Sequence, residues 1–440
     1  MKNVKQLSVN APAPTESLNT ANVSNGTKGS SHEEYANIII SPSGNNIEVP
    51  ASRSAVSDAE KLMHNLSGSP SMKHRRASRN SFGASLPIPA PRASPTGAYP
   101  RSLKEKVAAA KNMAFAFDID GVLLHGNNLI PETSRVMELL NGDNELGIKI
   151  PYILLTNGGV PHPMQALSEY YETVLVVGGE GYTARFAAEA YGFRNVVVPK
   201  DIVAWDPSIS PWRHFTEEER KEARPQDFDR VNFDAVLVFA DSRDYATDMQ
   251  IIMDLLTSVD GRLGTRSKDP IKTQLPIYFS HGDLIMPTEH KLGPRLTQGA
   301  FRIALEAQWK AITGGELERV VYGKPELATY KYADEVMRSW MKEIHNEHTI
   351  PENIYMIGDN PQSDIIGGNM YGWNTCLVRT GVFQGGDNDE ENPANFGVFP
   401  TVLDAVQAAV AKELGHEFKL RWSDKVNPAL HPESSLAAVE

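Results

Sequence analysis

The sequence predicts an α/β fold with a Rossmann-like core of parallel strands and a disordered N-terminal tail. Two observations indicate this fold. From about Leu103 onward, short apolar runs end in polar loops and are followed by stretches with helical periodicity, which is the pattern of βαβ units. Before that point, the chain is rich in serine and proline and has few apolar clusters.

Composition excludes several classes of protein. The chain has 440 residues, of which 41% are hydrophobic, so it can fold into more than one domain. Its apolar runs have the length of strands and are far shorter than the ~20 residues that span a bilayer, so we expect no transmembrane segment. The single cysteine, Cys376, excludes a disulfide framework and lies in an apolar run where we expect it to be inert. The net charge of -12 argues against a nucleic-acid partner.

Residues 1–100 form the predicted tail. They contain 17 serines and 10 prolines, with ten basic residues against six acidic ones. A segment of this composition cannot bury enough apolar surface to offset the conformational entropy lost on folding. Ser78 and Ser81 follow arginines within residues 74–81. This tract is either an ordinary solvated basic segment or the target of a basophilic kinase, which would make the chain a phosphoprotein.

Four apolar runs end in polar residues that could bind a ligand. In an open parallel sheet, the carboxyl ends of the strands meet at one crevice, so these residues are expected to lie close together. Helices are expected after three of the runs, over residues 133–140, 327–344 and 362–370, with Asn360 as the N-cap of the last. The runs and their exits are 113–117 before Asp118, 151–155 before Thr156-Asn157-Gly158-Gly159, 319–322 before Gly323-Lys324-Pro325, and 354–357 before Gly358-Asp359-Asn360.

The strongest chemical signal is the pair Asp118 and Asp120 at the end of the first run. The sequence Asp-x-Asp-Gly is also a common turn and the start of many calcium loops. Residues 121–124 offer no further oxygen ligands at the offsets that a calcium loop requires, which argues against that interpretation. Two carboxylates near the end of a buried strand repel each other unless a cation lies between them, so Mg²⁺ is expected.

The other exits supply groups that could complete such a site. Asp359 could ligate the metal, and Asp364 could either contribute to it or only favour a helix N-terminus. Lys324 offers a positive charge, although a lone lysine at a strand end is often solvated. Thr156, with the backbone amides that follow it, could form an anion-binding turn, although Asn-Gly-Gly is also an ordinary turn sequence.

In this order, these residues resemble the four motifs of the haloacid-dehalogenase-like hydrolase superfamily. The long insertion between the second and third motifs resembles subfamily IIA, which carries an α/β cap there, as in the nitrophenyl-phosphatase-like and nucleotide-phosphatase-like enzymes. Residues 155–159, 321–326 and 356–369 look most like the cat-eye-syndrome critical region 5 type, including its fungal members. The resemblance covers about residues 112–413.

The resemblance implies a Mg²⁺-dependent phosphomonoester hydrolase that acts on a small phosphorylated metabolite through an aspartyl-phosphate. Asp118 would be the nucleophile and Asp120 the general acid and base. Asp364 would orient Lys324 or a metal-bound water. The implied catalytic residues are Asp118, Asp120 and Lys324; the implied phosphate ligands are Thr156, Asn157, Gly158 and Lys324; and the implied metal ligands are Asp118, Asp120 through its main-chain carbonyl, Asp359 and Asp364.

The expected domains are a tail at 1–100, a first core segment at 101–172, an α/β cap at 173–312, a second core segment at 313–415 and a C-terminal tail at 416–440. In the cap we expect strands over 173–178 and 234–240 and a helix over 249–257. Arg243 and His281 are candidate substrate-facing residues there, with no assigned role in catalysis. Relatives usually carry Asn-Pro-Asp where this chain has Ser280-His281-Gly282-Asp283, so the substrate stays open.

Two other functions stay open at this point. One is a non-catalytic regulatory or binding protein that retains the hydrolase fold and recruits partners through its tail. The other is a phosphotransferase, in which an alcohol and not water accepts the phosphoryl group. The first residues lack the apolar segment of a secretory signal, and no arginine precedes Arg53, so a cytoplasmic location is expected. The family resemblance also admits a mitochondrial one.

The segment after the second motif is unusually short. In relatives, a helix, a further core strand and another helix precede the cap, whereas here only residues 160–172 lie between Gly159 and the first cap strand. Residues 164–171 can supply about two turns of helix, which leaves no room for a strand of typical length. We therefore expect that this chain lacks one strand of the core sheet or replaces it with an irregular connection.

Overall fold

The computed structural model describes residues 99–100, 102–158 and 162–420. Residues 1–98 of the predicted N-terminal tail, with its kinase site, and residues 421–440 of the predicted C-terminal tail lie outside these described residues. Among the described residues, no helix is both long enough and apolar enough to cross a membrane.

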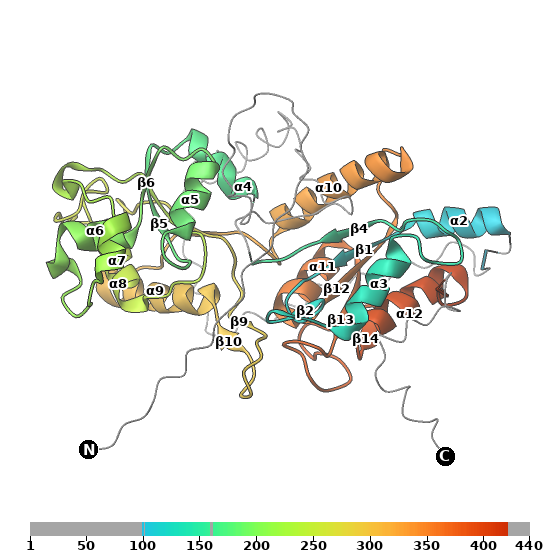
Figure 1. Ribbon diagram of the computed structural model, residues 1–440. Helices are drawn as coiled ribbons and strands as arrows, with labels where there is room; N and C mark the ends of the chain where they lie inside the picture. Colours follow the sequence, from blue (N-terminus) through green and yellow to red (C-terminus); the bar gives the residue numbers. More distant parts are fainter. Residues whose placement is uncertain (1–98, 101, 159–161, 421–440) are drawn as a thin grey trace, which may run out of the picture. The chain divides into compact units, whose positions relative to one another are not determined.

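Five described strands form the core sheet (Figure 1), which confirms the predicted parallel α/β fold. Its order is β14-β13-β12-β1-β4, and every pairing is parallel. The strands β1, β12 and β13 are buried almost throughout because helices cover both faces of a parallel sheet. Their bounds are β1 Met113–Phe117, β4 Tyr152–Leu154, β12 Asn353–Gly358, β13 Asn374–Val378 and β14 Gly397–Phe399.

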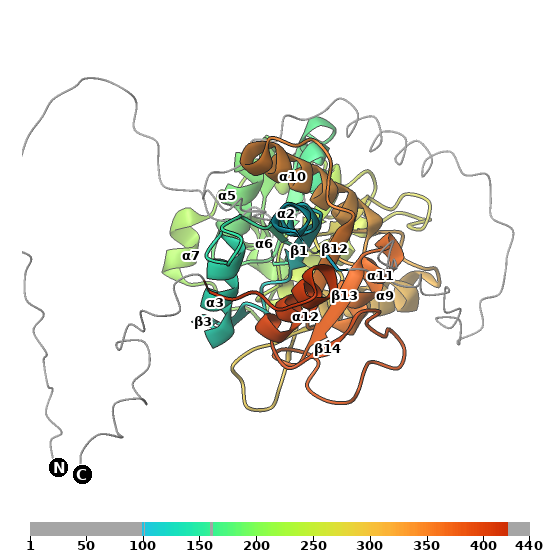
Figure 2. The ribbon, with the colours of Figure 1, turned by 90° about the vertical axis from the view of Figure 1, so that its right-hand side faces the viewer.

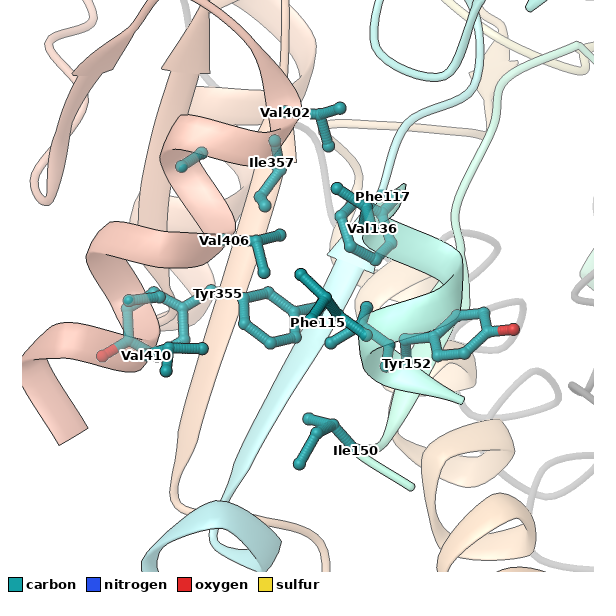
Figure 3. Packing of buried hydrophobic residues seen from close by; sticks show 14 of the residues in the cluster. Phe115, Phe117, Val136, Ile150, Tyr152, Tyr355, Ile357, Val402, Val406 and Val410 are labelled. Atoms are coloured by element: carbon teal, nitrogen blue, oxygen red, sulfur yellow. The ribbon is translucent and has the colours of Figure 1, made fainter. Parts of the chain in front are cut away.

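The alternation of side chains along β1 divides the core into two packed layers. Phe115 and Phe117 pack with residues of α3 (Pro131–Leu140) and α12 (Val402–Leu414), as Figure 3 shows. Ala114 and Ala116 pack on the other face with residues of α10 (Leu327–His345), and Figure 2 shows the sheet between these helices. Each large apolar side chain buried in this way contributes roughly 1.5–3 kcal/mol to stability. The predicted helices 133–140 and 327–344 are therefore confirmed.

Other short elements surround the core sheet. A π-helical turn over Pro361–Ile365 leads into α11 (Ile366–Tyr371), which confirms the helix predicted over 362–370. The side chain of Asn360 accepts a hydrogen bond from the Gln362 amide, as expected of an N-cap. The helix α2 (Leu103–Lys111) precedes β1, and the hairpin of β2 (Leu124–His125) and β3 (Asn128–Leu129) follows it.

A second sheet lies in the chain between the two core segments. Its order is β11-β8-β7-β5-β6, again with parallel pairing throughout. The expected strands at 173–178 and 234–240 and the helix at 249–257 are confirmed as β5, β7 and α8. The bounds are β5 Thr173–Val177, β6 Asn195–Val197, β7 Ala235–Val238, β8 Ile277–Phe279, β11 Val320–Val321, α5 Thr183–Ala190, α6 Pro199–Trp205, α8 Tyr245–Leu256 and α9 Gln298–Thr313, with a small hairpin of β9 Ile285–Met286 and β10 Arg295–Leu296.

One strand belongs to a different sheet from the one predicted. The run 319–322 was expected among the core strands, but β11 pairs with β8 through Val320 and Val321. Local sequence cannot decide this because the carboxyl end of a parallel strand looks the same whichever sheet it joins. Lys324 therefore reaches Asp118, at the carboxyl end of β1, from a strand of the second sheet.

The connection after β4 is short, as the sequence predicts. Its described part forms only α4 (His162–Gln165) and a 3₁₀ turn over Ala166–Glu169 before β5 begins. Within residues 102–158 and 162–420, no strand pairs with the side of β4 that faces away from β1. The described part of this connection therefore adds no strand to the core sheet, as either a missing strand or an irregular connection would predict.

An insertion tests the consequence of this missing strand. We expect that about 25–30 residues with the sequence of a strand and a helix, inserted after Gly159, raise the melting temperature and reduce aggregation, because they pair an open sheet edge. The measurements are differential scanning calorimetry and size-exclusion chromatography. An insertion of equal length made of Gly and Ser is the control, since it adds chain without a strand. Equal melting temperature and oligomeric state for all three proteins would contradict the prediction.

Candidate active site

The turn after β1 carries two of the predicted acids. The Asp118 amide donates to the carbonyl of Ile357 on β12, and its side chain is buried. Asp120 lies two residues further along and is half-buried. Gly121 has φ +88° and lies so close to the next loop that a Cβ there would be 2.5 Å from Asp359 Oδ2. Glycine is therefore required for both the turn and the close approach.

The loop after β12 brings two further carboxylates to the same place. Asp359 and Asp364 are both almost completely buried. The Asn360 amide donates to Asp364 Oδ2 at 3.0 Å, which fixes that carboxylate across the first turn of the helix. Asp118, Asp359 and Asp364 each offer a carboxylate oxygen, and these three oxygens lie within 4.8 Å of one another.

Lys324 lies among these acids and is 1% exposed. Its Nζ is 2.7 Å from Asp118 Oδ1 and 2.7 Å from Asp364 Oδ1. The side chain of Asn157 holds the backbone of this lysine: the Lys324 amide donates to Asn157 Oδ1 at 2.7 Å, and Asn157 Nδ2 donates to the Lys324 carbonyl at 3.2 Å. Asn157 was expected to contribute only its backbone amide, so this positioning role of its side chain is a new finding.

The charges in the cluster are strongly coupled. Burial raises the pKa of Asp359 well above its ordinary value, and the nearby Asp118 and Asp364 raise it further. Burial raises the pKa of Asp364 to about 6, although Lys324 opposes this shift. Burial also raises the pKa of Asp118, again against the effect of Lys324.

Lys324 stays protonated in this environment. Burial opposes its charge, but the carboxylates of Asp118 and Asp364 raise its pKa above the ordinary value. One ammonium cannot neutralise three carboxylates, so a further cation would stabilise the fully ionised cluster. The available donors are carboxylate oxygens, which fit a hard divalent metal ion.

The predicted phosphate turn lies beside Asp120. A Cβ at Gly158 would be 3.3 Å from Thr156 Oγ1 and 3.9 Å from Asp120 Oδ2. The Gly158 amide donates to the Thr156 hydroxyl at 3.0 Å, so the turn is stabilised from within. Gly159, the last residue of the motif, lies outside the described residues.

A fifth loop, which follows β13, also contacts Asp359. This contact was not predicted from the sequence. The Val382 amide donates to Asp359 Oδ2 at 2.6 Å, and the Phe383 amide donates to the Asp359 carbonyl. A Cβ at Gly381 would be 2.0 Å from Asp359 Oδ2, so this position needs glycine. The sequence did contain a signal: Gly381 follows shortly after the apolar run that contains Cys376, at one more strand exit.

Two segments of the chain match families of known proteins. Residues 115–176 match the family described as haloacid dehalogenase-like hydrolase, and residues 321–405 match the HAD-hydrolase-like family. The solved structure of a possible sugar phosphatase of the HAD superfamily from Cytophaga hutchinsonii aligns over 69% of this chain and 97% of its own, with 16% identity and a TM-score of 0.43.

Two curated yeast proteins are more similar in sequence. A Schizosaccharomyces pombe protein named cardiolipin synthase (CMP-forming) / mitochondrial hydrolase fusion protein is 38% identical over 331 residues, 69% of this chain, but this chain spans only 54% of it. The Saccharomyces cerevisiae protein named mitochondrial hydrolase YKR070W is 37% identical over 349 residues, which cover 69% of this chain and 97% of that protein. The chain therefore belongs to the haloacid dehalogenase-like hydrolases, as predicted, and is an enzyme of that family.

Proposed function

We propose that this chain is a Mg²⁺-dependent phosphomonoester hydrolase that passes the phosphoryl group of a small phosphorylated metabolite first to Asp118 and then to water. The observation that carries this proposal is the buried Lys324, whose ammonium pairs with Asp118 and Asp364 at 2.7 Å each. Such a cation beside a carboxylate at the end of a strand can neutralise phosphoryl oxygens while the carboxylate attacks phosphorus. The same intact set supports an enzyme over a non-catalytic protein with this fold.

The proposed reaction has two steps. In the first, an oxygen of Asp118 forms a bond to phosphorus while the bond from phosphorus to the leaving oxygen breaks, and Asp120 gives that oxygen its proton. In the second, Asp120 takes a proton from a water molecule, whose oxygen bonds to phosphorus as the bond to Asp118 breaks. Burial raises the pKa of Asp120, which favours its protonated form for the first step.

The remaining residues bind and orient. Lys324, Thr156 and the backbone amides of Asn157 and Gly158 would hold the phosphoryl oxygens, and Asp364 would keep Lys324 in place through their ion pair. Mg²⁺ would bind to Asp118, Asp359 and the main-chain carbonyl of Asp120, where it would neutralise charge on the phosphoryl group and the acids. The names of both yeast relatives include the word mitochondrial, which supports a mitochondrial location over the cytoplasmic one expected from composition.

Replacement of the nucleophile tests the mechanism. We expect Asp118→Asn to lower kcat for p-nitrophenyl phosphate by about three orders of magnitude or more, because an amide is a poor nucleophile of nearly the same shape. The melting temperature should change little, and Asp387→Asn, at an exposed position, should keep full activity. Retention of more than about a tenth of the wild-type rate by Asp118→Asn would rule out Asp118 as the nucleophile.

A matched pair of glycine variants tests the metal site. Gly381→Ala places a Cβ 2.0 Å from Asp359 Oδ2, so that carboxylate must move, whereas a Cβ at Gly385 meets nothing within 4 Å. We expect Gly381→Ala to weaken Mg²⁺ binding about tenfold or more, because ligand geometry limits Mg²⁺ affinity, and Gly385→Ala to leave it unchanged. Isothermal titration calorimetry measures the affinity, and thermal unfolding shows whether each variant is folded. Equal Mg²⁺ affinity in two folded variants would argue against Asp359 as a ligand.

A further inference from the structure

The carboxyl edge of the second sheet carries a row of polar residues that ends at the proposed phosphoryl site. The strands β7, β8 and β11 are neighbours in that sheet and run parallel, so the loops after them emerge at one edge. The loop after β7 carries Asp241, the loop after β8 carries His281 and Asp283, and the loop after β11 carries Lys324. The row therefore leads away from the lysine that would hold the phosphoryl group.

His281 is the centre of this row and has unused hydrogen-bonding capacity. Its side chain is 9% exposed, and its Nε2 is 3.8 Å from Asp241 Oδ1 while its Nδ1 is 3.9 Å from Asp283 Oδ2. Both distances exceed those of a hydrogen bond. His281 Nδ1 and Asp241 Oδ1 are buried and have no hydrogen-bond partner among the described residues. A buried polar group without a partner is costly, so a bound molecule that supplies the partner is favoured.

The row is tied to the proposed phosphoryl site by short contacts. Asp283 Oδ2 accepts a hydrogen bond of 2.8 Å from Asn157 Nδ2, and Asn157 in turn holds the backbone of Lys324. His281 also lies against Gly323, where a Cβ would be 3.0 Å from the Cβ of the histidine. The His281 amide donates to Gln298 Oε1 at 3.2 Å, which fixes the residue on its other side. The row is therefore contiguous with the residues that precede and hold Lys324.

We propose that Asp241 and His281 form the leaving-group subsite, and that they select a leaving group with hydroxyls and reject one that carries a second negative charge. This inference rests on the proposed phosphatase function and names its substrate class. A hydroxyl can donate to Asp241 Oδ1 and can either donate to or accept from the imidazole. A second anion would instead face the carboxylates of Asp241 and Asp283 in a partly buried site, where their repulsion is weakly screened.

Two three-carbon phosphoesters test the charge selection. The compounds sn-glycerol 3-phosphate and 3-phosphoglycerate share a three-carbon skeleton. The first carries a hydroxymethyl group where the second carries a carboxylate. We expect wild-type kcat/KM to favour glycerol 3-phosphate, and Asp241→Asn to lower this ratio about tenfold, because the variant removes one charge at nearly constant shape. His281→Asn should raise KM for glycerol 3-phosphate several-fold with a smaller change in kcat. Asp254→Asn, on α8 and outside the row, should leave the ratio unchanged.

Turnover of p-nitrophenyl phosphate separates failure of this inference from failure of the proposed function. If the wild-type protein hydrolyses none of the three esters, the proposed phosphatase function is wrong, and so is the subsite that rests on it. If it hydrolyses p-nitrophenyl phosphate but neither three-carbon ester, or prefers 3-phosphoglycerate, the substrate class is wrong. An unchanged ratio and KM in both Asp241→Asn and His281→Asn would show that water alone satisfies these groups.

Discussion

The site depends on the ion pairs that Lys324 makes with Asp118 and Asp364. Three carboxylates converge there in a region closed to solvent, and burial by itself would drive them to bind protons. The ammonium favours the ionised forms of Asp118 and Asp364, which it contacts. A further cation would be needed to balance the negative charge of Asp359. Loss of Lys324 would leave both carboxylates buried without this counterion, a change that typically costs about 3–5 kcal/mol, so the lysine constrains both stability and chemistry. Burial raises the pKa of Asp118, and the adjacent ammonium opposes that rise and so favours the ionised form that the proposed nucleophile requires.

The backbone around Lys324 explains how two sheets contribute to one site. Lys324 follows β11 of the second sheet, yet its ammonium lies among acids that follow β1 and β12 of the core. Asn157, after the core strand β4, binds both the amide and the carbonyl of Lys324 through its side chain. The same asparagine contacts Asp283 after β8. A change in Asn157 would therefore disturb both the proposed phosphoryl site and the row that carries Asp283.

The sequence predicted the residues that follow directly on buried parallel strands. Asp118 and Asp359 were found because an apolar run that stops at an acid places that acid at the edge of a sheet, whatever the tertiary contacts are. The sheet to which β11 belongs could not be predicted, since strand pairing is decided by contacts between distant segments. The role of Gly381 was also hidden, because the need for glycine arises from the approach of Asp359 and not from local backbone conformation.

The missing strand affects the edge of the core and leaves its centre intact. β1 and β12 are central strands with neighbours on both sides, and the loops after β1, β12 and β13 supply the three acids and the amide that fixes Asp359. β4 is the edge strand in the described part of the sheet, and it contributes Asn157 and the Thr156 turn. The acids proposed to bind the metal are therefore not adjacent to the short connection. The residues that position Lys324 and would bind the phosphoryl group are next to it. Any loss of function caused by that connection should accordingly arise in substrate binding before it arises in metal binding.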